Sequence, residues 1–202
     1  QHPMVPENGI NSDMDGSAPD QCGTALLLVD VINHFEFPDA PELLQNWGPA
    51  ALRLAELKRR AKSHGIPVVY VNDNFGKWRS SFAGLLAYCT RPEARGREVV
   101  SALAPHEDDY FVLKPKHSGF YQTPLEILLT NLGTKKAIIA GVTTNNCVLF
   151  TASDAYMRDL QVQVPRDCVA AASVTAHETA LEHIATVLKA NVAAATEMSL
   201  GC

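Results

Sequence analysis

The chain has 202 residues, of which 47% are hydrophobic and 19% charged, and its formal net charge is −5. This length suits one domain with a single large core and leaves little room for a second. The sequence carries no basic stripe and no apolar run near the roughly 20 residues needed to cross a membrane, so neither a nucleic-acid nor a membrane partner is expected.

The five cysteines are widely spaced, odd in number and form no CxxC pair. A disulfide framework or a structural zinc site is therefore not expected, and reduced thiols would suit the cytoplasmic location that we predict. Residues 1–21 are polar and lack the basic start and apolar core of a signal peptide. We expect a flexible N-terminal arm over residues 1–21, or an arm that packs on a neighbouring subunit, ahead of one domain over residues 22–202.

The first half of the domain begins with two predicted strands and a helix between them. Residues 24–30 form an apolar run that ends in Asp30, which is typical of a strand buried on both faces. Residues 49–64 mix apolar and charged positions as an amphipathic helix does. Residues 66–71 predict a second buried strand, and residues 76–97 are expected to be irregular or partly helical.

The second half continues this alternation. Residues 109–113 predict a short strand, and residues 123–132 a helix that Thr123 caps and Gly133 ends. The remaining elements follow in order: strand 136–140, a helix from Cys147 to Asp159, strand 161–165 and helix 175–191. Strands that alternate with helices imply a three-layer α/β/α fold with a mostly parallel central sheet and Rossmann-like topology.

Three polar residues fall at the carboxyl ends of predicted strands: Asp30, Lys114 and Cys147. In open parallel sheets the reactive crevice lies beyond these ends, so we expect the three side chains to converge there. A helix N-terminus would favour the thiolate of Cys147 and could bind an oxyanion. Each residue also has a simpler interpretation, namely a buried inert cysteine, a surface lysine and a capping acid.

The chain resembles the isochorismatase-like hydrolase superfamily at three motifs in the same order and spacing. Residues 27–35 (LLVDVINHF) are similar to its first motif, residues 114–124 (KPKHSGFYQTP) to its lysine motif, and residues 140–152 (AGVTTNNCVLFTA) to its nucleophile motif. The resemblance covers roughly residues 22–195. It implies the isochorismatase-like form of the α/β/α fold.

The resemblance also implies a catalytic triad. Asp30 would act as general base on the Cys147 thiol and then as acid to the leaving group, while Lys114 would orient Asp30 and stabilise the thiolate. Cys147 would attack a carbonyl and form a thioester, which water hydrolyses. A cis peptide bond between Val142 and Thr143 is expected to aim the N–H groups of Thr143 and Cys147 at the oxyanion.

Two departures from the family pattern bear on the site. Ile32 and His34 replace the usual Gln and Asp of the first motif, and His34 is most simply a solvent-facing or supporting histidine. Nicotinamidases of the superfamily carry Asp-x-His after the second strand, where this chain has Asp-Asn-Phe at residues 73–75. Without clustered imidazoles we expect no metal and no other cofactor, and nicotinamidase activity is disfavoured.

The leading functional hypothesis is hydrolysis of a C–N bond in a small amide, carbamoyl or ureido compound. Phe35, Asn74 and Trp78 lie beside the motifs and are the candidates for substrate binding, although each could equally serve packing. The alternatives are vinyl-ether hydrolysis of the isochorismatase type, which does not need the cysteine, and a non-catalytic binding protein on the same fold. The resemblance further implies a homo-oligomer, either a dimer or a tetramer.

Overall fold

The computed structural model describes residues 20–202. The strands of this part of the chain are β1 (Thr24–Val29), β2 (Val68–Asp73), β3 (Tyr110–Lys114), β4 (Lys136–Val142), β5 (Gln161–Gln163) and β6 (Val169–Ala170). Its helices are α1 (Ala40–Ser63), α2 (Phe82–Thr90), α3 (Arg97–Ala102), α4 (Leu125–Leu132), α5 (Leu149–Met157) and α6 (Val174–Thr186). Short helical turns are the π-helical η1 (Thr144–Val148) and the 3-10 turns η2 (Arg166–Cys168) and η3 (Ala195–Glu197).

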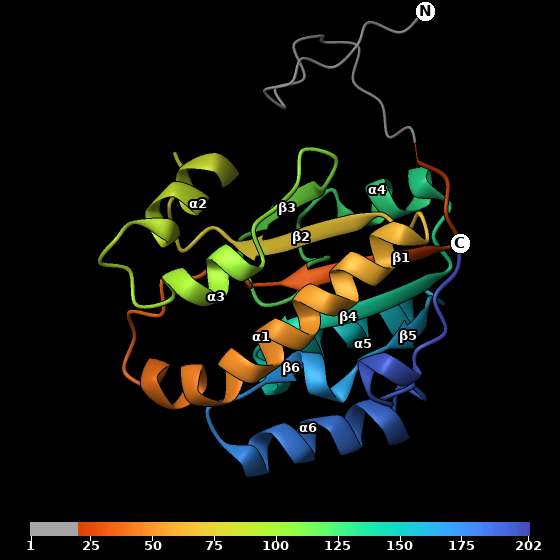
Figure 1. Ribbon diagram of the computed structural model, residues 1–202. Coiled ribbons are helices and arrows are strands. Elements are labelled where there is room, and N and C mark those ends of the chain that lie inside the picture. The colour runs from red at the N-terminus through yellow and green to blue at the C-terminus, as the bar shows by residue number, and fades with distance from the viewer. Residues whose placement is uncertain (1–19) are drawn as a thin grey trace, which may run out of the picture.

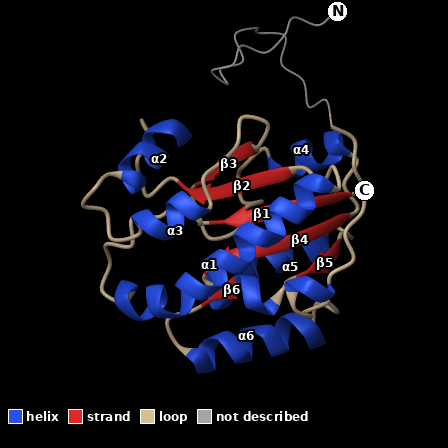
Figure 2. Cartoon of the chain, in the orientation of Figure 1, coloured by secondary structure: helices blue, strands red, loops and turns tan. Residues whose placement is uncertain are grey.

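The strands form one parallel sheet in the order β3-β2-β1-β4-β5. The short strand β6 also pairs with β4, at Gly141 and Val142, which follow the β4 residues that pair with β5. Helices cover both faces, with α1 and α3 in front of the sheet and α4 and α5 behind it, and α6 lies along the β5–β6 end (Figure 1, Figure 2). The predicted three-layer fold is therefore confirmed. The predicted arm lies outside the described residues, apart from Asp20 and Gln21.

The centre of the sheet explains why its strands appear in the sequence as unbroken apolar runs. Every side chain of β1 is buried, and so is every side chain of β4 after Lys136. Leu26 of β1 lies opposite both Val68 of β2 and Ile138 of β4, so β1 is enclosed on both edges and both faces. A strand in this position needs no alternation of apolar and polar residues.

Several element boundaries differ from the sequence predictions, most of all at α1 and at the last helix, and one strand was not predicted. α1 begins nine residues earlier than predicted, at Ala40 instead of residue 49, and contains Pro49 in its interior. Its added turns bury Leu43 and Trp47 in the core, and this packing outweighs the unfavourable proline. The last helix ends at Thr186, and the two-residue strand β6 is too short to leave a sequence pattern.

The cysteines also correct a prediction. Cys22 and Cys202 form a disulfide across 180 positions of sequence, with their Cα atoms 4.6 Å apart. The expectation of reduced thiols is wrong for this pair, and the predicted cytoplasmic location loses that support. Spacing alone could not reveal the pair because the fold brings the last residue beside the start of β1, where the Thr24 hydroxyl donates to the Gly201 carbonyl at 2.7 Å. No helix among residues 20–202 has the combined length and apolar character of a membrane span.

Candidate active site

The structure brings the three predicted triad residues together at the carboxyl edge of the sheet. Lys114 Nζ lies 3.0 Å from Asp30 Oδ2 and 3.6 Å from Cys147 Sγ. Asp30 follows β1, Lys114 ends β3, and Cys147 lies in the η1 turn directly after β4. Lys114 is fully buried and Asp30 almost so, whereas Cys147 is half-buried. An ammonium, a carboxylate and a sulfur thus share a site that excludes most water.

The backbone after β1 fixes the Asp30 carboxylate. Asp30 has a positive φ of 52°, which turns the chain sharply at the strand end. Its Oδ1 accepts a hydrogen bond of 2.6 Å from the Asp73 N–H, while Oδ2 faces Lys114. The buried Asn72 side chain bonds both the N–H and the C=O of Ile32, at 3.1 and 2.8 Å. Neighbouring strand β2 therefore holds both the carboxylate and the loop that follows it.

Asp73 is a site residue that the sequence predictions did not include. Its Oδ2 lies 3.7 Å from Lys114 Nζ, so the lysine faces two carboxylates. The carbonyl of Lys116 accepts a further hydrogen bond from the ammonium at 3.2 Å. One signal could have identified Asp73: it ends β2, which lies between the strands that carry Asp30 and Lys114. In the sequence analysis Asp73 appeared only as the first residue of the segment that corresponds to the Asp-x-His motif of nicotinamidases.

The surroundings of Cys147 oppose the effect expected from a helix N-terminus, which would favour the thiolate. Burial raises the pKa of Cys147 to about 12, the negative charge of Asp30 adds to this rise, and the charge of Lys114 opposes it. Burial also raises the pKa of Asp30, against the opposing charge of Lys114 and the hydrogen bond from the thiol. The Lys114 pKa is raised by Asp30 and Cys147 against the effect of its own burial. Near neutral pH the Cys147 thiol is therefore neutral, and it lies beside a charged Lys114 and a carboxyl group that takes up a proton more readily than an exposed aspartate does.

Two contacts tie the loop after Lys114 to the helix after Cys147. The Ser118 hydroxyl donates to the Asp154 carboxylate, and the Gly119 N–H donates to Thr151 Oγ1 at 3.0 Å. Asp154 and Thr151 belong to α5, which continues from the η1 turn. These bonds fix the separation of the lysine and the sulfur.

The turn that carries Cys147 begins at a cis peptide bond between Val142 and Thr143. The Thr143 carbonyl accepts from the N–H groups of Asn146 at 3.1 Å and Val148 at 3.2 Å. The turn therefore closes back on the residue that follows the cis bond. Cys147 sits one residue before the end of this closed turn.

The predicted substrate-binding residues differ in how far they are buried. Phe35 is fully buried and packs beside Phe37, and Trp78 projects outward with 80% of its surface exposed. Loop folding thus sends Phe35 into the core and Trp78 into solvent, and the role of both in substrate binding stays a prediction. Asn74 is half-buried, and its N–H donates to the Lys114 carbonyl at 3.1 Å. His34 is also half-buried, and its ring lies tilted against that of Phe75 with the ring centroids 5.0 Å apart.

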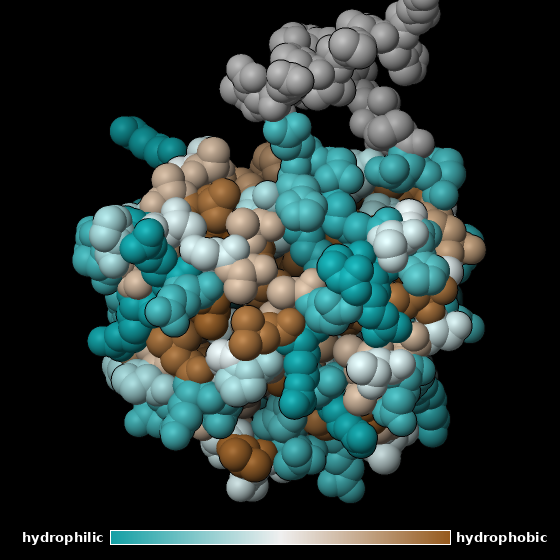
Figure 3. Space-filling view, viewed as in Figure 1, coloured by the Kyte–Doolittle hydropathy of each residue, from teal (hydrophilic) through white to brown (hydrophobic). Residues whose placement is uncertain are grey.

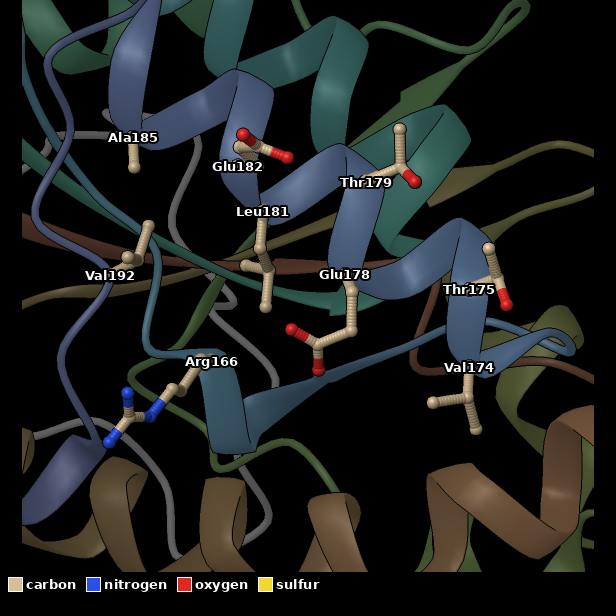
Figure 4. Close-up of a pocket in the computed structure, with 9 residues that line it drawn as sticks. All are labelled: Arg166, Val174, Thr175, Glu178, Thr179, Leu181, Glu182, Ala185 and Val192. Carbon is tan, nitrogen blue, oxygen red and sulfur yellow. The ribbon is translucent and has the colours of Figure 1, made fainter.

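Residues 20–202 contain no group of three His, Cys, Asp or Glu side chains that could hold a metal ion. Phe75 stands where the nicotinamidase motif would need an imidazole, so the side chains present do not fit such a centre. A hollow of about 520 Å³ opens along α6, where Arg166, Glu178 and Glu182 are among its lining residues (Figure 4). The lining of this hollow includes none of the triad residues.

Comparisons with known proteins agree with this geometry. The family model for the isochorismatase domain matches residues 24–197. The uncharacterized isochorismatase family protein YaaI of Bacillus subtilis is 40% identical over 168 residues, which cover 83% of this chain and 92% of YaaI. The ureidoacrylate amidohydrolase RutB of Methylobacterium radiotolerans is 30% identical over 70% of this chain and 65% of RutB.

Among solved structures, the N-carbamoylsarcosine amidase from Thermoplasma acidophilum matches with a TM-score of 0.63 and 29% identity, covering 87% of this chain and 98% of that chain. The domain match spans all the strands from β1 to β6 and all three residues of the Asp–Lys–Cys cluster. The chain therefore belongs to the isochorismatase-like hydrolase superfamily.

Proposed function

We propose that this chain is a cysteine-dependent hydrolase that cleaves a C–N bond of a small amide, carbamoyl or ureido substrate. The observation that carries the proposal is the position of Lys114 Nζ, 3.0 Å from Asp30 Oδ2 and 3.6 Å from Cys147 Sγ. The names of RutB and of the N-carbamoylsarcosine amidase support the substrate class, since both describe C–N bond hydrolases. The substrate within this class stays open.

The chemistry follows from the protonation of the site. As Cys147 Sγ attacks the substrate carbonyl, its proton passes to Asp30, whose raised pKa suits a base that accepts and later returns a proton. Lys114 keeps its charge and stabilises the sulfur as negative charge develops on it. The C–S bond forms, the C–N bond breaks, and Asp30 returns the proton to the leaving nitrogen. Water, deprotonated by Asp30, then cleaves the thioester and restores the thiol.

The negative charge on the carbonyl oxygen also needs donors. We assign this role to the N–H groups of Thr143 and Cys147, at the two ends of the segment that carries the nucleophile. Fixed N–H donors of this kind typically contribute about 10²–10³-fold to the rate. The closed η1 turn supports the assignment because it holds the two groups in a constant relation to the sulfur.

The test is a panel of small amides and ureides scored for ammonia release by wild-type protein and by Cys147→Ala. We expect turnover of at least one member of the panel and its complete loss in the variant, because no thioester can form. Cys168→Ala is the matched control, since Cys168 is a free, buried cysteine outside the site. Its turnover should equal that of the wild type.

Other results of this panel would contradict the proposal. Amide turnover that survives in Cys147→Ala would exclude covalent catalysis, and turnover of a vinyl ether alone would favour the isochorismatase-type reaction. If no compound turns over and Cys147 reacts with a thiol probe no faster than free cysteine, the non-catalytic binding role replaces the proposal.

We also propose that the protein works as a homo-oligomer, either a dimer or a tetramer. Large apolar side chains stand exposed on several helices: among them, Leu52 of α1 is 65% exposed, Met157 of α5 is 68% exposed and Val174 of α6 is 64% exposed. Figure 3 shows hydrophobic surface interspersed with hydrophilic residues on the face that α1 presents. Size-exclusion chromatography with light scattering should give two or four times the 21.9 kDa chain mass. A monomer at micromolar concentration would refute this proposal.

A further inference from the structure

The η1 turn has a support outside the catalytic cluster, on helix α6. The Thr144 hydroxyl lies 2.8 Å from His177 Nδ1, and this hydrogen bond joins residues 33 positions apart. Thr144 is fully buried, and the His177 side chain is only 17% exposed. Thr144 is the first residue of the turn, next to Thr143 and three residues before the sulfur.

This bond is the polar contact between the first residue of the nucleophile turn and the helix packed on it. α6 packs against η1, and Ser173 caps the helix by accepting from the Ala176 N–H at 3.3 Å. His177 therefore projects from the capped first turn of α6. Burial lowers the pKa of His177, so the ring is neutral near pH 7 and one nitrogen can accept from the hydroxyl.

Among residues 20–202, the other ring nitrogen of His177, Nε2, makes no strong interaction that would compete with the bond between Nδ1 and Thr144. Its neighbour Glu178 is 3.9 Å away and 71% exposed, which leaves a weak, water-screened interaction. The bond to Thr144 is thus the strong one. Removing the partner of a fully buried hydroxyl costs more stability than removing that of an exposed one, because water cannot replace the lost hydrogen bond.

We propose that His177 is a positioning residue for catalysis, which acts through Thr144 to hold the turn that presents Cys147 and the Thr143 N–H. This inference rests on the proposed function for its catalytic consequence, but its structural half can be measured without a substrate. His177 touches neither the sulfur nor Asp30 in the contacts described above, so its effect must pass through the turn.

The experiment compares matched pairs of variants by hydrogen–deuterium exchange and by kinetics. Thr144→Val and His177→Leu remove the hydrogen bond at nearly constant volume, whereas Thr144→Ser and His177→Asn keep a polar partner in reach. We expect exchange of the amides in residues 144–148 to quicken about 3- to 10-fold in the first pair, the ratio that corresponds to one ordinary hydrogen bond. In the second pair the exchange rate of these amides should stay close to that of the wild type. Exchange in β1 should not change in any variant.

The kinetic half uses the substrate selected by the panel. In Thr144→Val and His177→Leu, kcat should fall by a similar factor with KM nearly unchanged, and the double variant should be no worse than either single one. Glu178→Gln is the control: it removes the weak, exposed neighbour of His177 and keeps the hydrogen bond to Thr144, so exchange in the turn should stay as in the wild type.

Three outcomes would overturn the inference. These are unchanged exchange in the turn in both bond-removing variants, a double variant whose effects simply add, or faster exchange with unchanged kcat. Failure of the proposed function is a separate result, because it appears as turnover that survives Cys147→Ala, whatever the exchange data show.

Discussion

Replacing Lys114 by methionine is expected to lower turnover by at least about 100-fold and to destabilise the fold by about 3–5 kcal/mol. Methionine fills a similar volume but leaves the buried Asp30 without its cation. The pKa of Asp30 then rises further, so the carboxyl becomes protonated and cannot take the thiol proton. The sulfur also loses the ammonium 3.6 Å away that stabilises its negative charge.

The loss of stability in Lys114→Met should depend on pH in a defined direction. The pKa of Asp30 in the folded variant then lies well above its value in the unfolded chain. Between these two pKa values the folded state binds more protons than the unfolded state, so stability falls as pH rises. Urea unfolding should therefore show a smaller deficit at pH 5 than at pH 8. A deficit that grows towards acid would contradict the proposed pairing.

Lys58→Met provides the matched control for Lys114→Met. Lys58 is also buried, and its Nζ lies 2.7 Å from Asp109 Oδ2, outside the active site. The control variant should lose comparable stability, yet its folded fraction should turn over substrate at the wild-type rate. Equal losses of turnover in the two variants would mean that Lys114 acts only through stability.

Replacing Gly141 by alanine is the substitution for which we expect the largest purely structural effect. Gly141 lies opposite Val29 in the β1–β4 ladder and has a φ of 122°. An added Cβ would lie 2.0 Å from the Val29 carbonyl oxygen and 2.8 Å from its nitrogen. Backbone atoms of the central strand cannot move aside as a flexible side chain could, so strain and overpacking add to about 2–6 kcal/mol.

The measurement for Gly141→Ala is thermal and urea unfolding beside Gly48→Ala. Gly48 lies within α1, and a Cβ there meets nothing within 4 Å. The stability of the control should change by no more than about 1 kcal/mol, because the helix preference of alanine is opposed by the crowding of its Cβ against the ring of Pro49. A Gly141→Ala protein as stable as the wild type would show that the β1–β4 contact can relax. Since Gly141 leads directly into Val142 and Thr143, turnover should fall together with stability.

Much of the fold could be predicted from the sequence because its strands are buried on both faces. The runs at residues 24–30 and 136–140 consist of almost continuous apolar residues, and such runs identify central parallel strands without any knowledge of their partners. The same local patterns placed Asp30, Lys114 and Cys147 at strand ends. Their convergence then followed from the rule that parallel strands end at one edge.

Other features of the site and the fold depend on contacts between distant segments, so only the tertiary structure shows them. The disulfide of Cys22 with Cys202, the Asp73 carboxylate beside Lys114, the burial of Phe35 and the exposure of Trp78 have no local sequence pattern. The thiol pKa belongs to the same class, because burial and the Asp30 charge outweigh the local effect of a helical turn. Short-range patterning determined which elements form and where polar residues end them, while the surroundings of each side chain are set by packing, which no single segment encodes.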